Sequence, residues 1–70
     1  MVFIVLFKYT GHAAQKMDAL GIDKSEVENV VIKGSKWKEN DVIHSKMGGI
    51  EVVFKRVENE IIVITVYYSD

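Results

Sequence analysis

Cysteine and proline are both absent from this chain of 70 residues. Without cysteine, neither a disulfide nor a thiolate zinc site can stabilise so small a core. The apolar runs are all far shorter than the roughly 20 residues that a membrane-spanning helix needs. Charge of one sign is also lacking, because nine basic residues nearly balance ten acidic ones and leave a formal net charge of −1. We therefore expect a single domain over residues 1–70, in the cytoplasm, with no membrane contact and no strongly basic arm for nucleic acid.

Leucine is scarce as well, and β-branched residues take its place. The chain holds eleven valines and eight isoleucines against two leucines. Such side chains are stiff at χ1 and pack well on a pleated surface, so they predict a protein dominated by its sheet. The charged residues are mostly lysine and glutamate, a composition typical of thermophile proteins.

The most apolar stretch is residues 1–7, rich in Val, Ile and Phe. It has no basic leader and no small-residue cleavage site, and Lys8 interrupts it, so a signal peptide is a poor interpretation. We predict a buried strand here.

Two helices are predicted next. Thr10 can cap the first, which starts near Gly11 or His12 and ends at Gly21. Its apolar stripe consists of Ala13, Met17 and Leu20.

The second helix follows after about three residues, which predicts a tight helical hairpin. Asp23 and Glu26 form a pair similar to a capping box, and Gly34 supplies the stop. The buried face consists of Val27, Val30 and Val31.

Three strands are predicted to complete the sheet, over residues 41–47, 50–57 and 61–68. Gly48-Gly49 is a two-residue hairpin turn, and Asn59 is expected at positive φ in the second turn, Glu58-Asn59. The register of the first hairpin pairs Lys46 with Glu51 and Ile43 with Phe54.

The last of these strands is apolar on both faces, so we expect it between the preceding strand and the N-terminal strand. The fold class is then α+β, in the order β-α-α-β-β-β. A two-helix hairpin packs on one face of a mostly antiparallel, four-stranded sheet.

Strict alternation leaves several apolar side chains on the sheet face without helices: Val53, Ile62, Ile64, Val66 and Tyr68. Exposed apolar patches of several hundred Å² usually mark partner sites. We therefore expect a homodimer or an antitoxin-like protein partner to cover this face.

The strongest candidate for chemistry is His12, with Lys16 one helical turn away on the same face. His12 could act as a general acid or base while a cation holds phosphate, which suits phosphodiester chemistry. Lys55 and Arg56 point to opposite faces of their strand, so one of them could join this groove. Thr65 and Tyr67 share one face of the last strand and could supply hydroxyl groups there. The simpler interpretation is that His12 is just a residue of the first helical turn and Lys16 a solvated charge. The strand charges would then pair with Glu51 and Glu60.

A loose basic run surrounds the single tryptophan and is a candidate nucleic-acid surface: Lys33, Lys36, Trp37, Lys38 and Lys46. Lysines could contact phosphates while Trp37 stacks on a base. In a strand, however, the lysines would share one face and Trp37 would cap the core edge on the other. His44 and His12 lie too far apart in the chain to define a metal site, and no cofactor motif is present.

The chain also carries a motif that extends over nearly its whole length. Tyr9-Thr10-x-His12-Ala13-x-x-Lys16-Met17 is followed by Leu20-Gly21-Ile22, by Ser25-Glu26-Val27 and by a closing Val63-Ile64-Thr65-Val66-Tyr67. This pattern resembles a family of small proteins catalogued as a domain of unknown function, with a His-Ala-x-x-Arg-Met helix. The family is similar in element order to RelE- and BrnT-type toxins, which are small RNA-cleaving proteins of toxin–antitoxin pairs.

The resemblance implies a RelE-like fold and an RNA-directed role, with RNA or the ribosome as target and an antitoxin as protein partner. His12 matches the family histidine, whereas Lys16 and Leu20 stand where the family has arginines. Lysine keeps the charge but lacks the guanidinium fork that grips phosphate, and leucine removes the charge. From this resemblance, the leading hypothesis is an endoribonuclease with His12 as acid or base. In it Lys16 and either Lys55 or Arg56 hold phosphate. The alternative is a non-catalytic module that homodimerises through its sheet.

Overall fold

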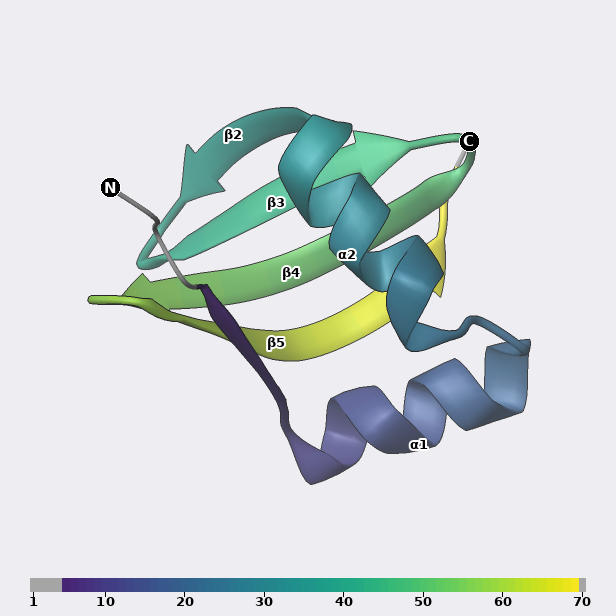
Figure 1. Ribbon diagram of the computed structural model, residues 1–70. Helices are drawn as coiled ribbons and strands as arrows, with labels where there is room; N and C mark the ends of the chain where they lie inside the picture. Colours follow the sequence, from purple (N-terminus) through teal and green to yellow (C-terminus); the bar gives the residue numbers. More distant parts are fainter. Residues whose placement is uncertain (1–4, 70) are drawn as a thin grey trace.

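A computed structural model describes residues 5–69 and has an α+β fold with two helices and one five-stranded mixed sheet (Figure 1). The elements in chain order are β1 (Leu6–Tyr9), α1 (Gly11–Leu20), α2 (Lys24–Lys33), β2 (Ser35–Glu39), β3 (Val42–Met47), β4 (Ile50–Val57) and β5 (Glu60–Tyr68). Residues 1–4 of the predicted N-terminal strand lie outside the described residues. Neither helix in this range has the length and hydrophobicity needed to cross a membrane.

The prediction of a four-stranded sheet is wrong by one strand, β2. The spatial order is β1-β5-β4-β3-β2, and β2 pairs antiparallel with β3 at the far edge. Every residue of β2 is exposed, so the strand has none of the apolar alternation by which strands are recognised. The last strand does lie between the preceding strand and β1, as predicted, but β1 and β5 are parallel, which makes the sheet mixed.

Both helices begin as their capping residues predict. The Thr10 hydroxyl accepts a hydrogen bond from the Ala13 amide at 3.0 Å, and the Asp23 carboxylate accepts one from the Glu26 amide at 2.9 Å. Gly21 ends α1 with φ of 70°, in the left-handed region that favours glycine.

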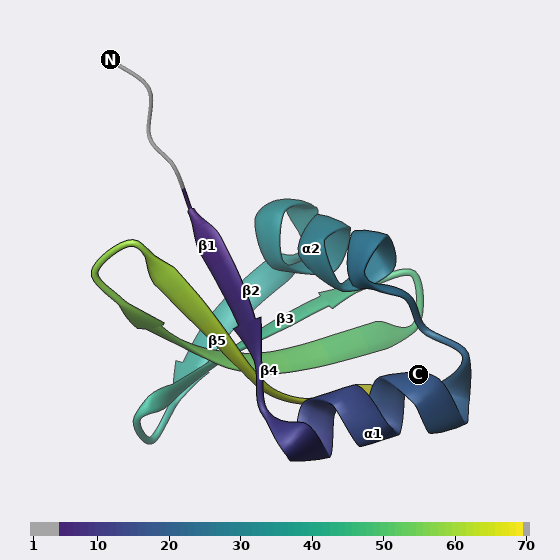
Figure 2. The ribbon, with the colours of Figure 1, turned by 60° about the horizontal axis from the view of Figure 1, so that its bottom comes forward.

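The predicted helical hairpin is not formed, because α1 packs on β1 and β5 whereas α2 packs on β3 and β4. Figures 1 and 2 show that the two helices diverge after their short connection and do not lie along each other. Their buried residues nevertheless join one core with the sheet face beneath them. The opposite side of the sheet is called the open face below.

A bulge in β5 decides which side chains reach the open face. Val53 pairs with Thr65 while the next residue, Phe54, pairs with Val63, so Ile64 is an extra residue in β5. Beyond it the alternation is reversed. Val66 is therefore fully buried on the helix side.

The prediction that Val66 and Tyr68 line an uncovered apolar face is therefore wrong. The Tyr68 hydroxyl instead donates to the Leu20 carbonyl at the end of α1, at 3.0 Å. The open face receives Thr65 and Tyr67 in their place. A second local prediction also fails, because Glu58 and not Asn59 has positive φ (55°) in the turn before β5.

Candidate functional site

One row of side chains crosses the open face, with one residue from each of four neighbouring strands. Trp37 of β2 is the register partner of His44 of β3, and Tyr67 of β5 is the partner of Glu51 of β4. His44 and Glu51 are diagonal neighbours, because Glu51 itself faces Lys46. Long side chains can span such a diagonal. The row, Trp37–His44–Glu51–Tyr67, is called the open-face row below.

Glu51 is the centre of the row and the most buried of its members, with only 7% of its surface exposed. Its Oε2 atom accepts hydrogen bonds from the Tyr67 hydroxyl and from Nδ1 of His44, the latter at 2.9 Å. Burial alone would raise the pKa of Glu51, but hydrogen bonds from Tyr67, His44 and Ser69 and the charge of His44 hold this pKa below its usual value. The carboxylate is therefore ionised near neutral pH.

An ionised Glu51 fixes the tautomer of His44. A carboxylate can only accept hydrogen bonds, so Nδ1 of His44 must carry a proton. In the neutral ring Nε2 is then the atom with a free lone pair. It lies 3.8 Å from Oε2 of Glu39, which is beyond hydrogen-bond distance.

Trp37 covers one side of the imidazole. The two rings stack with centroids 5.2 Å apart and planes 13° from parallel. Because Trp37 is 40% exposed, part of its indole remains open to solvent. An exposed aromatic ring of this kind can stack on a nucleic-acid base.

Tyr67 closes the row as a protonated hydroxyl. Its hydrogen bond to Glu51, together with burial and the nearby carboxylates, raises its pKa to about 12. Tyr67 therefore acts as a donor that holds Glu51 in place, and it does not ionise near neutral pH.

The sequence-predicted pair His12 and Lys16 lies elsewhere, on α1. His12 is exposed in the first turn and, within residues 5–69, its side chain makes no hydrogen bond or ion pair. No described residue orients its ring, in contrast to the ring of His44. Lys16 lies one turn further on and is half-buried.

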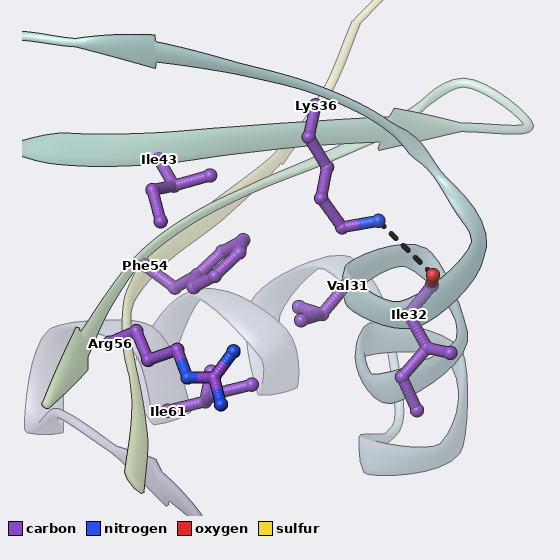
Figure 3. A pocket seen from close by; sticks show the side chains of 7 residues that line it. All are labelled: Val31, Ile32, Lys36, Ile43, Phe54, Arg56 and Ile61. Atoms are coloured by element: carbon purple, nitrogen blue, oxygen red, sulfur yellow. Dashed lines mark hydrogen bonds between the residues drawn. The ribbon is translucent and has the colours of Figure 1, made fainter. Parts of the chain in front are cut away.

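The cations expected to join His12 are separated by the sheet. Lys55 lies on the open face opposite Ile62, and Arg56 lies on the helix face opposite Ile61. Arg56 and Lys36 line the same pocket between α2 and the sheet, without His12 (Figure 3).

The predicted basic run is likewise divided between two faces. Trp37 and Lys46 lie on the open face, whereas Lys36 and Lys38 are register partners of Ser45 and Ile43 and point to the helix side. The alternation predicted for a strand here is therefore observed. Trp37, however, packs on His44 and does not cap the core.

Sequence reasoning considered His44 only as a metal ligand and Glu51 only as a charge partner. The predicted register of Lys46 with Glu51 is confirmed. In this register His44 is the diagonal neighbour of Glu51, so the proximity of these two side chains could have been predicted. The contact of Glu51 with Tyr67 could not have been predicted, because it depends on the bulge at Ile64. Within residues 5–69 no group of three His, Cys, Asp or Glu residues could hold a metal ion.

Comparisons with known proteins identify the fold and the family. A chain in the crystal structure of the toxin–antitoxin complex RelBE2 from Mycobacterium tuberculosis has a similar fold, with a TM-score of 0.65 and 8% sequence identity. The similarity covers 93% of this chain and 98% of that chain. No curated protein sequence matches. Residues 9–68 match the family described as Domain of unknown function (DUF4258), and this chain belongs to that family.

Proposed function

We propose that this protein is the toxin-type member of a toxin–antitoxin pair and that it cleaves single-stranded RNA on its open face. The observation that carries the proposal is the His44–Glu51 pair beside the exposed ring of Trp37. The fold similarity to a chain of a toxin–antitoxin complex supports the toxin type and an antitoxin as partner. The role of acid or base moves from His12 to His44, since within the described part of the chain His44 has a group that orients its ring and His12 has none.

In the proposed reaction, Trp37 stacks on a base and brings a ribose 2′-hydroxyl to Nε2 of His44. Nε2 accepts the hydroxyl proton while the 2′-oxygen forms a bond to phosphorus. The bond from phosphorus to the 5′-oxygen breaks, and this oxygen takes a proton from water. The hydroxide that remains takes the proton from Nε2 of His44, which returns the imidazole to its neutral form. The products are a 2′,3′-cyclic phosphate and a 5′-hydroxyl end.

Glu51 assists as a positioning residue. It accepts the Nδ1 proton of His44 and stabilises the imidazolium that forms when Nε2 takes a proton. Lys46 and Lys55 lie on the same face and supply positive charge for the phosphate.

A non-catalytic interaction module is the second candidate function. It is favoured by the position of His12, which is exposed and does not line the pocket that contains Arg56. The dimer form of this hypothesis loses support, because the bulge replaces Val66 and Tyr68 on the open face by Thr65 and Tyr67.

The test is cleavage of a single-stranded RNA, with and without ribosomes, by wild type and by two matched variants, His44→Gln and His12→Gln. Glutamine can keep a hydrogen bond to Glu51, so His44→Gln should fold, which circular dichroism checks. We expect His44→Gln to slow cleavage about 100-fold or more, the usual contribution of a general acid or base, and His12→Gln to leave it unchanged. The reverse result would return the role to His12. If the wild type cleaves the RNA neither with nor without ribosomes, the interaction module is the remaining candidate function.

A further inference from the structure

A pocket on the helix side, unrelated to the open-face row, lies between the C-terminal half of α2 and the sheet (Figure 3). It has a volume of about 230 Å³. Its walls are apolar, from Val31 and Ile32 of α2 and from Ile43, Phe54 and Ile61 of the sheet. We call it the α2 pocket.

Two cations lie at the rim of the α2 pocket. Figure 3 shows Lys36 and Arg56 on either side of the apolar residues. Within residues 5–69 neither makes an ion pair. The Lys36 ammonium donates to the Ile32 and Gly34 carbonyls, both at 3.1 Å, and keeps a third N–H.

Arg56 has still more unused donors. Among residues 5–69 only its Nε–H finds a partner, in a bond of 3.3 Å to the Glu58 carbonyl. The four remaining N–H groups of the guanidinium form the fork that matches a carboxylate.

The size of the pocket indicates what fits in it. Typical small-molecule pockets measure about 300–1,000 Å³, so the α2 pocket is closer to the size of one side chain. At its edge Ile32 is 63% exposed, which extends the apolar surface beyond the pocket. Exposed apolar surface continuous with a pocket is typical of a site where one anchor side chain inserts.

We propose that the α2 pocket binds one apolar side chain of a protein partner, with an adjacent carboxylate of the same segment held by Arg56 and Lys36. The partner segment is therefore acidic and carries a leucine-like anchor. The inference rests on the proposal that the chain has a protein partner, and it does not depend on RNA cleavage, because the pocket and the open-face row lie on opposite sides of the sheet.

The test uses the full chain and the peptide acetyl-Glu-Glu-Leu-Glu-Glu-amide in an NMR titration. We expect chemical-shift changes at Ile43, Phe54 and Ile61. Replacing the peptide leucine by alanine should weaken binding about tenfold, because the buried apolar surface is lost. A peptide with lysines in place of the glutamates should not bind.

Two neighbouring residues provide matched variants. Arg56→Gln should weaken peptide binding about fivefold, the size of one partly exposed ion pair, whereas Lys55→Gln on the open face should not weaken it. Equal effects of the two variants, or shift changes confined to the open face, would contradict the inference. Displacement of the peptide by a uridine oligonucleotide that shifts the same pocket residues would assign the pocket to RNA. RNA cleavage is measured separately, so either proposal can fail alone.

Discussion

Nδ1 of His44 lies 2.9 Å from Oε2 of Glu51, although the strand register does not place these two residues opposite each other. The contact is diagonal, and Tyr67 donates to the same oxygen from the other side. Only 7% of the surface of Glu51 is exposed. Removing its two hydrogen-bond partners is therefore costly, because an unpaired buried carboxylate is strongly disfavoured. The three groups thus behave as one electrostatic unit.

The pKa of Tyr67 should depend directly on the charge of Glu51. In the variant Glu51→Gln the carboxylate that raises the Tyr67 pKa is gone, so we expect this pKa to fall from about 12 toward its ordinary value of 10.0. A tyrosinate absorbance titration measures the change, and Tyr67→Phe identifies which of the three tyrosines it belongs to. The exposed Glu58→Gln serves as control and should leave the titration unchanged. A Tyr67 pKa that stays near 12 without the Glu51 charge would contradict the assignment.

Acid stability should depend on the same carboxylate. The pKa of Glu51 is lower in the folded protein than its usual 4.5, so its ionised form stabilises the fold at higher pH. This contribution is fully present above the unfolded pKa and is lost as the pH falls through the folded pKa. We therefore expect the free energy of unfolding of wild type to decline below about pH 4.5.

The measurement is denaturant unfolding over a pH series, for wild type and for Glu51→Gln. The variant should be less stable near neutral pH and should show a shallower decline in acid, since it has no charge to lose at this position. Parallel curves for the two proteins would mean that Glu51 is not the group responsible.

Much of the fold could be predicted from local signals. The caps at Thr10 and Asp23, the Gly48-Gly49 turn and the pairing of Lys46 with Glu51 each depend on neighbouring residues, and the structure contains all of them. The position of β5 between β4 and β1 was predicted as well, from the apolar character of β5 on both faces.

Two features could not be predicted, because they arise from pairing between distant segments. An exposed strand such as β2 has no apolar alternation and is recognised only by its bonds to β3. The bulge at Ile64 adds one residue to a continuous apolar run, where nothing marks the position. That single residue moves Tyr67 to the open face and so completes the candidate site.

Trp37 is expected to contribute to RNA binding through stacking. Replacing it by alanine should weaken binding of a single-stranded oligonucleotide by about 1–3 kcal/mol, roughly 5- to 150-fold. Trp37→Phe should lose less, because an aromatic face remains. Electrophoretic mobility shift measures both.

The matched control for Trp37 is Tyr68→Ala, which removes an exposed aromatic ring from the other face of the sheet. Binding by this variant should equal that of wild type. If both substitutions weaken binding alike, the oligonucleotide does not distinguish the two faces, and the open-face site is wrong.

Gly34 allows α2 to approach β3 closely, and its replacement tests how tightly the two elements are packed. A Cβ at this position would lie 2.5 Å from the Val30 carbonyl and 2.9 Å from that of Lys46, and neither backbone atom can move without shifting its element. It would also lie 2.5 Å from the Ser45 hydroxyl, which donates to the same Val30 carbonyl. Gly34→Ala should therefore destabilise the fold by about 1–3 kcal/mol, as overpacking usually does.

Denaturant unfolding measures this loss of stability, with Gly11→Ala as the control. A Cβ at Gly11 meets nothing within 4 Å, and the start of a helix tolerates alanine. Equal stability of the two variants would show that α2 can move away from the sheet at no cost.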